Sequence, residues 1–237
     1  MADAALTAAR WDQEYRDERY ANEPPVPFVS TIIDLLRDHP RIARGRGLYV
    51  GCGNGRNYIP LVRGGLDLCG VDVSLEALTR LVQREPASRG RLICADFRAL
   101  ESPRPLFDYL IAIQVFQHGD DAAVTTYFEK VAALLRPDGL LFLRANSVAT
   151  EIHRAHAIVE RNTWGGFTVR YEEGPKAGLL IHFYSAFELQ ERFSGAFTAV
   201  MPAREHVTVR PAPQTGSWAQ WEAVWQRRAP ATFGGGD

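Results

Sequence analysis

Short apolar runs alternate with helical stretches between residues 47 and 144, and this alternation constrains the fold more than any other sequence feature. The apolar runs predict strands over residues 47–51, 66–71, 91–95, 107–114 and 140–144. The stretches between them predict helices over residues 56–62, 75–84 and 122–135. Strands that are apolar throughout are typical of a parallel sheet covered by helices on both faces. The sequence therefore predicts a doubly wound α/β fold.

The segments on either side of this alternation differ from it in pattern. A charged helix is predicted over residues 8–22, before a proline-rich break at 23–27, and a second helix over 29–37. Residues 147–182 read as an insertion, and helix or strand signals return at 185–193, 207–209 and 218–226. We expect an N-terminal helical lid or cap over residues 1–45, a main domain over 46–230 and a flexible tail over 231–237.

Charge and cysteine content exclude several classes of protein. The 27 basic and 28 acidic residues give a formal net charge of −1, which does not favour nucleic acid as a partner. Only three cysteines occur, without a CxxC pair, so neither a disulfide framework nor a structural zinc site is expected. The N-terminus has no apolar signal segment, and no apolar run approaches the ~20 residues of a membrane span. We expect a cytoplasmic protein.

The stretch LYVGCGNGRN, residues 48–57, is the clearest candidate for a ligand site. Glycines at 51, 53 and 55 permit a tight strand-to-helix turn and close approach of a ligand to the backbone. Unpaired N–H groups at the start of the following helix favour an anionic group there. A plain strand-to-helix turn remains the alternative.

Polar or aromatic residues also follow the next three strands. Asp72 comes 21 residues after Gly51, and a carboxylate at that position can accept hydrogen bonds from both hydroxyls of a ribose. Alternatively, Asp72 or Ser74 could cap the next helix. After the third strand, Asp96 could read an adenine edge and Phe97 offer a stacking face, or Asp96 could be an ordinary loop acid. QVFQH, residues 114–118, follows the fourth strand. Since ligands bind at the carboxyl ends of strands in such sheets, the pattern predicts a nucleotide-type ligand.

These motifs resemble those of the class I S-adenosylmethionine (SAM)-dependent methyltransferases. VGCGNG, VDVS, CADF, FDYLIAIQVFQH and LLRPDGLLFLR are similar to successive family motifs and cover about residues 46–145. HFYSAFELQERF and WAQWEAVWQRR resemble the last elements of members that act on small molecules. The resemblance implies a seven-stranded, mostly parallel sheet with an antiparallel last strand. It also implies SAM as cofactor and a small-molecule methyl acceptor, with O, N, S and C all open as the acceptor atom.

The resemblance assigns cofactor roles by position. It implies that the glycine turn approaches the methionine moiety, that Asp72 takes the ribose hydroxyls, and that the Gln114 carbonyl meets the methionine ammonium. An N-terminal helix closes over SAM in many small-molecule members, which adds two aromatic residues to the set. The implied cofactor residues are Trp11, Tyr15, Gly51, Gly53, Gly55, Arg56, Asn57, Asp72, Asp96, Phe97 and Gln114.

Two rival functions stay open. One is a SAM-binding protein without catalysis. The other is an NAD(P)-dependent oxidoreductase, which is disfavoured because the GxGxxG fingerprint would need glycine where Arg56 stands. Enzymes that methylate nucleic-acid bases often carry a (D/N)PP string after the fourth strand, and QVFQH has no proline.

His118 is the candidate general base, because it follows the fourth strand close to where the methyl group is expected; a packing role is the alternative. His153, His156 and Glu160 follow i, i+3, i+7 spacing and would share one face of a lid helix, and no metal site is expected from them. The insertion's aromatics line a substrate pocket or form its own small core. The substrate candidates are His153, His156, Trp164, His182 and Tyr184. Trp218, Trp221 and Trp225 mark a helical stripe by spacing, whereas the resemblance favours a strand.

Overall fold

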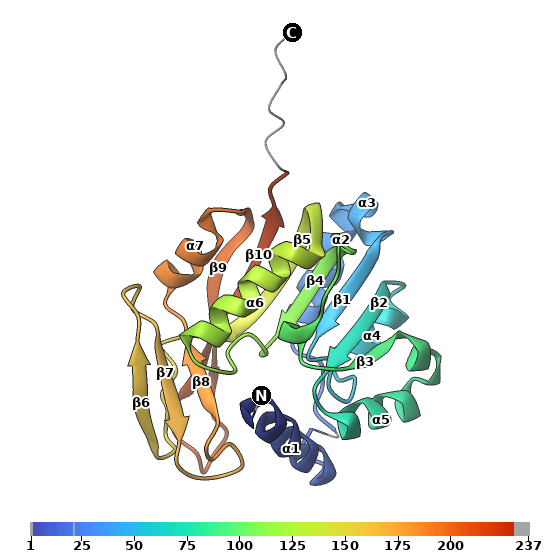
Figure 1. The fold of residues 1–237 in the computed structure, drawn as a ribbon. Coiled ribbons are helices and arrows are strands. Elements are labelled where there is room, and N and C mark those ends of the chain that lie inside the picture. The colour runs from blue at the N-terminus through green and yellow to red at the C-terminus, as the bar shows by residue number, and fades with distance from the viewer. Residues whose placement is uncertain (1, 21, 230–237) are drawn as a thin grey trace.

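The computed structural model describes residues 2–20 and 22–229. Its centre is a seven-stranded sheet in the order β3-β2-β1-β4-β5-β10-β9 (Figure 1). The strands are β1 (Arg46–Val50), β2 (Asp67–Asp72), β3 (Leu92–Cys94), β4 (Phe107–Ile113), β5 (Leu135–Asn146), β9 (Phe197–Val209) and β10 (Ser217–Arg227). In this sheet β10 alone runs opposite to the other six strands, because it pairs antiparallel with both β5 and β9. The predicted doubly wound sheet with an antiparallel last strand is confirmed, and Trp218, Trp221 and Trp225 lie on that strand.

Helices cover both faces of the sheet. They are α1 (Ala2–Arg16), α2 (Phe28–Asp38), α3 (Pro40–Ala43), α4 (Tyr58–Arg63), α5 (Leu75–Arg84), α6 (Asp121–Leu134) and α7 (Ala186–Ser194), with short 3₁₀ helices η1 (Pro86–Arg91) and η2 (Phe97–Ala99). Successive strand residues face opposite sides. Leu48 belongs to a core cluster with side chains of α6 and α7, whereas Tyr49 belongs to one with side chains of α2, α4 and α5. Each face therefore has its own apolar core, which is why the strands read as unbroken apolar runs.

The N-terminal helix differs from its predicted bounds. It spans Ala2–Arg16 instead of 8–22, so that Tyr20 lies in the turn that follows it. By contrast, α5 begins and ends at the predicted residues, because Ser74 caps it: the Ser74 hydroxyl accepts the Ala77 N–H at 3.0 Å. Ser74, and not Asp72, is therefore the capping residue.

The insertion at 147–182 forms a second, three-stranded antiparallel sheet, not a lid helix. Its strands are β6 (His156–Arg161), β7 (Phe167–Tyr171) and β8 (Leu180–Phe183). The prediction that His153, His156 and Glu160 share a helix face is wrong, since His156 and Glu160 lie on β6 and His153 precedes it. Asn162 turns the chain here: its side-chain oxygen accepts N–H groups from Trp164 and Gly166, and this hairpin turn pairs β6 with β7.

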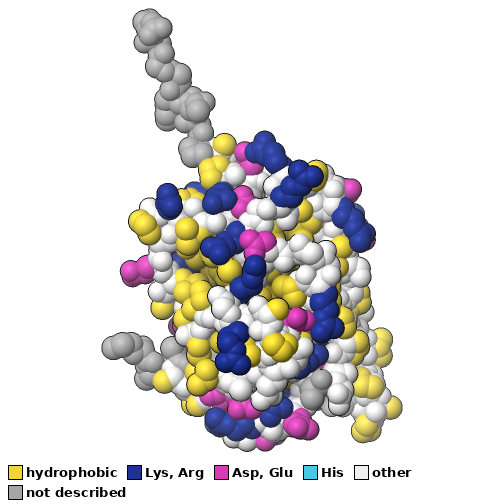
Figure 2. Space-filling model, turned by 90° about the vertical axis from the view of Figure 1, so that its right-hand side faces the viewer, with side chains coloured by type: hydrophobic (Ala, Val, Ile, Leu, Met, Phe, Trp, Pro, Cys, Tyr) yellow, Lys and Arg dark blue, Asp and Glu magenta, His cyan; other side chains and the backbone are white. Residues whose placement is uncertain are grey.

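Charges of both signs are interspersed on the face shown in Figure 2, as the near-zero net charge leads one to expect. Among the described residues, no helix is both long and apolar enough to cross a membrane. The predicted tail, residues 231–237, lies outside the described part of the chain.

Candidate functional site

A cavity of about 990 Å³ lies between the carboxyl ends of the central strands and α1. Parallel pairing of β1 with β2 and β4 brings the turns after these strands to one edge of the sheet. The cavity is lined by ten of the predicted cofactor residues: Trp11, Tyr15, Gly51, Gly53, Arg56, Asn57, Asp72, Asp96, Phe97 and Gln114. His118 and His153 line it as well. The structure thus gathers the four strand-end motifs of the sequence in a single cavity.

The glycine turn approaches the cavity so closely that side chains would not fit. Gly51 and Gly53 have positive φ angles of 68° and 53°. A Cβ on Gly51 would lie 2.1 Å from the Val115 side chain, and one on Gly53 would lie 2.4 Å from the Tyr15 hydroxyl. Gly55 differs, because a Cβ there would meet Ile59 and Leu81 in the core. Gly55 therefore permits helix packing and does not line the cavity.

Asp72 places a buried carboxylate at the cavity wall, with 8% of the residue exposed. One carboxylate oxygen accepts the Gly53 N–H at 2.8 Å, and the other accepts the Ser74 N–H at 2.9 Å. Burial raises the pKa of Asp72 to about 6, although its backbone hydrogen bonds act in the opposite direction. Since an ionised carboxylate has about four acceptor positions, this group retains capacity for donors on a ligand.

Asp96 and Phe97 are more occupied than the sequence suggests. Burial opposes ionisation of Asp96, but hydrogen bonds and an ion pair with Arg98 at 2.6 Å outweigh it, and its pKa lies below the usual value. Phe97 is only 3% exposed, and its ring stacks on Phe116 at a centroid distance of 5.6 Å. One side of the ring is therefore occupied by the core, and its role as a stacking face for adenine stays a prediction.

The roof of the cavity is α1 with its aromatic side chains. The Trp11 ring lies 6.4 Å from that of Tyr15 and 6.2 Å from that of Tyr20. Asp12 holds this helix against α5, since its carboxylate accepts the Ser74 hydroxyl at 2.6 Å and the Glu76 N–H at 3.1 Å. The first turn of α5 is thus linked both to the roof and, through Ser74, to Asp72.

Arg56 and Asn57 attach the proline-rich segment to the glycine turn. The Arg56 guanidinium pairs with Glu23 at 2.5 Å and donates to the Pro24 carbonyl at 2.6 Å. The Asn57 side-chain oxygen accepts the Val26 N–H at 2.9 Å. Both residues border the cavity, but their polar groups already have protein partners.

His118 also lines the cavity, and the centroid of its ring lies 5.3 Å from that of Trp11, with the two rings nearly perpendicular. Burial, and then the charge of Lys176, lower the pKa of this imidazole to about 3. Its Nδ1 atom is buried without a hydrogen-bond partner in the described part of the chain. Gln114, at the start of the same turn, has a φ of 60°, and its N–H donates to the Arg144 carbonyl at 2.7 Å. His118 is therefore neutral at physiological pH and has an unused nitrogen.

The small sheet contributes a wall of the cavity through β8. The Gly119 N–H donates to the Leu180 carbonyl at 3.0 Å, and the His182 N–H to the Gln117 carbonyl at 2.7 Å. These bonds attach β8 to the turn after β4, beside His118. The insertion is therefore part of the candidate site.

Four of the five predicted substrate residues are not among those lining the cavity. The Tyr184 hydroxyl is buried and donates to the Phe116 carbonyl, and Trp164 lies under the Arg192 guanidinium at 5.1 Å. The His156 Nδ1 atom lies 2.7 Å from the Arg154 carbonyl oxygen. Only His153 fits the prediction of a cavity position, because the strands turn the other side chains toward their own sheet or the core.

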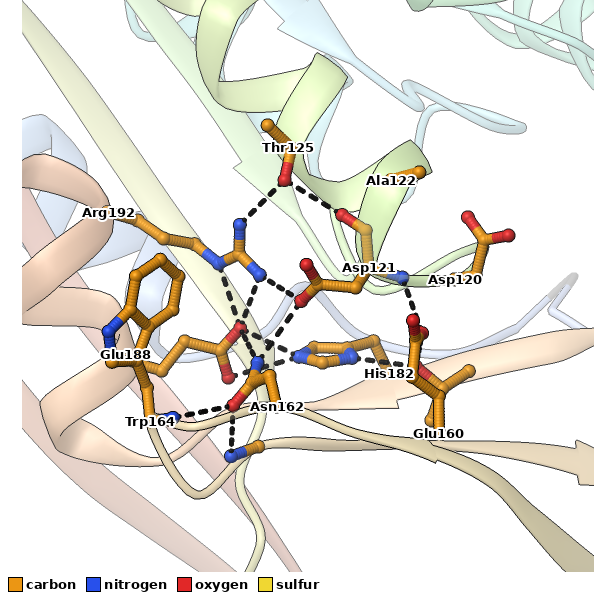
Figure 3. A network of polar contacts seen from close by, with 12 residues as sticks. Asp120, Asp121, Ala122, Thr125, Glu160, Asn162, Trp164, His182, Glu188 and Arg192 are labelled. Carbon is orange, nitrogen blue, oxygen red and sulfur yellow. Dashed lines mark hydrogen bonds and ion pairs between the residues drawn. The ribbon is translucent and has the colours of Figure 1, made fainter.

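His182, the fourth of these, belongs to a buried polar network (Figure 3). Its Nδ1 lies 2.9 Å from the Thr168 hydroxyl and its Nε2 lies 2.9 Å from Glu188. Asp121, His182 and Glu188 together have the donor atoms of a metal site. However, the Arg192 guanidinium pairs with Glu188 at 2.7 Å and also with Asp121. A cationic side chain thus already pairs with both carboxylates, and the network joins the small sheet to α6 and α7.

Sequence reasoning missed several basic residues in the lining. Arg144 ends an apolar run and is 4% exposed, paired with Glu222 at 2.8 Å. A charge at the end of a buried strand was a signal that could have identified it. Arg154, Lys176 and Arg210 also line the cavity, and they come from loops or strand ends without a recognisable motif.

Comparison with known proteins agrees with this geometry. Residues 48–139 match the family model described as a methyltransferase domain. A stretch of 100 residues is 32% identical to a ubiquinone biosynthesis O-methyltransferase of Bradyrhizobium diazoefficiens. This match spans 40% of the present chain and 38% of that relative, well under half of either.

Solved structures resemble the whole fold. A Burkholderia thailandensis 1,6-didemethyltoxoflavin-N1-methyltransferase with bound S-adenosylhomocysteine (SAH) superposes with a TM-score of 0.64 at 19% identity, covering 95% of this chain and 89% of that one. A magnesium protoporphyrin IX methyltransferase of Synechocystis PCC 6803 with bound SAM gives 0.63 at 15% identity, covering 95% and 97%. Residues 48–139 thus correspond to a methyltransferase domain, and the chain has the fold of these SAM- and SAH-bound methyltransferases.

Proposed function

We propose that this protein transfers the methyl group of SAM to a small-molecule acceptor by in-line displacement. The observation that carries the proposal is the cavity of about 990 Å³, which the strand-end motifs line together with the small sheet. Its volume is at the upper end of the range for small-molecule sites. Cofactor and acceptor can therefore share one cavity, as the reaction requires.

In the proposed cofactor half, Asp72 accepts the ribose hydroxyls with its free acceptor positions, and Asp96 accepts from the adenine amino group. The backbone at Gly51 and Gly53 borders the methionine moiety, and the Gln114 carbonyl accepts from its ammonium. Trp11 and Tyr15 close this half from above and exclude water. The support is their common position on the cavity wall and the uncommitted acceptor capacity of Asp72.

Methyl transfer needs little covalent assistance, because the sulfonium leaving group is already activated. Holding the acceptor in line with the methyl group supplies roughly 7–11 kcal/mol of barrier reduction. We propose that the unused Nδ1 of His118 accepts a hydrogen bond from the acceptor's hydroxyl or amine. Since the pKa of His118 is only about 3, the proton moves to it only as the acceptor atom becomes strongly acidic during methylation.

The names of the relatives suggest which acceptor atoms to examine first. The curated relative is an O-methyltransferase and the toxoflavin enzyme is an N1-methyltransferase. Hydroxyl groups and ring nitrogens are therefore the first acceptors to test in this protein.

The test combines binding with turnover. Calorimetric titration with SAH, SAM and NAD(H) should show binding of the first two in the micromolar range, roughly −8 kcal/mol, and none of NAD(H). Incubation with labelled SAM and a panel of phenols and nitrogen heterocycles should then yield methylated product. Binding of SAH without product from any acceptor would favour the non-catalytic alternative, and binding of NAD(H) alone would favour an oxidoreductase.

A further inference from the structure

We propose that the acceptor carries an anionic group, a carboxylate or a phosphate, which Lys176, Arg154 and Arg210 bind. The inference rests on the proposed function, because it concerns the half of the cavity that the cofactor leaves free. It goes further by naming the chemical class of the acceptor and the residues that select it.

The charges lining the cavity are unevenly paired. Four lining cations each have a carboxylate partner: Arg19 with Glu14, Arg56 with Glu23, Arg98 with Asp96, and Arg144 with Glu222. The acidic lining residues are Glu23, Asp72 and Asp96, which all border the proposed cofactor half. Within residues 2–20 and 22–229, Arg154, Lys176 and Arg210 form no ion pair. The rest of the cavity therefore holds an excess of positive charge.

Lys176 lies next to the proposed reaction centre. Its ammonium is 5.7 Å from the centroid of the Trp11 ring, and that ring is itself 5.3 Å from His118. The Lys176 charge is also one cause of the low pKa of His118. An anionic group bound to Lys176 would therefore hold an acceptor beside His118.

Arg154 and Arg210 extend the positive region away from His118. Both line the same cavity as Tyr171, and the charge of each lowers the pKa of that phenol, although burial raises it overall. Arg210 is 5% exposed, and its guanidinium donates to the Thr215 carbonyl at 3.0 Å and to the Glu151 carbonyl. Its Nε atom, however, is buried without a hydrogen-bond partner among the described residues. Such an unpaired buried donor is costly unless a ligand satisfies it.

The physical argument is that these cations have no carboxylate partner in an ion pair. Lys176 has only the Trp11 ring and a weaker interaction with Glu14, and Arg210 has two backbone carbonyls. Burial lowers the pKa of Lys176, which shows that the protein disfavours its charged form. An anionic ligand would restore the lost interaction with charge-assisted hydrogen bonds. The aromatic rings of Trp11, Tyr171 and Trp218 border the same space, which suits a planar apolar body between the anion and the methyl-accepting atom.

Calorimetry on the SAH-saturated protein tests the proposal with matched probes. The first pair is 4-hydroxybenzoate against 4-hydroxybenzamide, and the second is phenyl phosphate against phenol. We expect at least one anion to bind about tenfold or more tightly than its neutral partner, and added salt to reduce the difference. The pair with the larger difference identifies the anion as carboxylate or phosphate.

Variants assign the effect to the named residues. Lys176→Gln and Arg154→Gln should each reduce anion affinity about tenfold while the neutral probes are unaffected, and Lys176→Arg should restore most of it. Arg170→Gln is the matched control, because Arg170 is exposed on the same small sheet and does not line the cavity. Thermal unfolding of each variant verifies folding.

Three results would overturn the inference. The first is equal binding, or no binding, of the anions and their neutral partners. The second is an anion preference that survives both glutamine variants. The third is loss of SAH affinity in Lys176→Gln with unchanged anion preference, which would assign Lys176 to the methionine carboxylate. These results are distinguishable from failure of the proposed function. In all three, SAH still binds the parent protein, whereas a parent protein that does not bind SAH would refute the proposed function itself.

Discussion

Protonation of Asp72 should control cofactor affinity in mildly acidic solution. The buried carboxylate already accepts N–H groups from Gly53 and Ser74, at 2.8 and 2.9 Å, and it binds ribose hydroxyls best as an anion. Its pKa of about 6 lies well above that of an ordinary aspartate. SAH affinity should therefore be constant above this pKa and fall below it.

The magnitude follows from the pKa. At about pH 5 only about one tenth of a group with pKa 6 is ionised, so SAH affinity should fall roughly tenfold from its value at about pH 7.5, or about 1.4 kcal/mol. Acid unfolding caused by protonation of Asp72 would not explain this loss of SAH affinity. A carboxyl with a raised pKa in the folded state binds its proton more tightly there than in the unfolded chain, so its protonation favours folding as the pH falls through about 6.

Calorimetric SAH titrations across this pH range, with the parent protein and two variants, provide the measurement. Asp72→Ala should weaken SAH binding by about 1–3 kcal/mol at neutral pH and abolish the acid-dependent fall. Asp96→Asn is the comparison, because the pKa of Asp96 lies below its usual value and this group stays ionised at about pH 5. That variant should keep the pH dependence. An unchanged affinity in Asp72→Ala, or the same acid-dependent fall in that variant, would refute the assignment of Asp72 to the ribose.

Three further outcomes are expected. His118→Ala should lower the rate on a hydroxyl or amine acceptor about 10²–10⁴-fold, with SAH affinity nearly unchanged. The rate of the parent protein should show no His118 titration near neutrality, because the pKa of His118 is about 3. Equal rates of parent and variant would reduce His118 to a packing residue. Amide hydrogen exchange over residues 2–16 should slow when SAH is added, and unchanged protection would argue against a ligand-ordered roof. His182→Ala should lower the free energy of unfolding by roughly 2–4 kcal/mol in denaturant titrations, because it leaves a cavity and removes the partner that Glu188 and Thr168 share; a loss below about 0.5 kcal/mol would contradict that role.

Helix α5 and its flanks show how far local sequence signals reach. Its bounds were predicted to the residue, because a serine cap and an amphipathic pattern are written in consecutive residues. The position of Asp72 at the cavity wall was predicted for a similar reason, since the carboxyl ends of parallel strands lie at the same edge of the sheet, where ligands bind. The competition between Asp72 and Ser74 for the cap was decided by hydrogen bonds that the sequence does not show.

The insertion shows where these signals fail. Spacing at His153, His156 and Glu160 fits a helix, yet β6 forms because it pairs with β7, farther along the chain, and β7 pairs in turn with β8. The aromatic and histidine residues between 156 and 184 looked like pocket residues by type. The burial of His182 and Tyr184 beside α6 and α7 depends on pairings between segments distant in sequence, which type and spacing do not encode.

The sequence alone determined the doubly wound sheet, the glycine turn and the strand-end carboxylates, because these depend on local periodicity and on the rule that parallel strands end at one edge. Only the tertiary structure decided which residues face the acceptor half of the cavity. Lys176, Arg154 and Arg210 come from three separate segments, and their shared lack of carboxylate partners becomes visible only when those segments meet. A charge is paired or unpaired according to its neighbours in space, and those neighbours are set by the packing of the small sheet, β9 and α1 around one cavity.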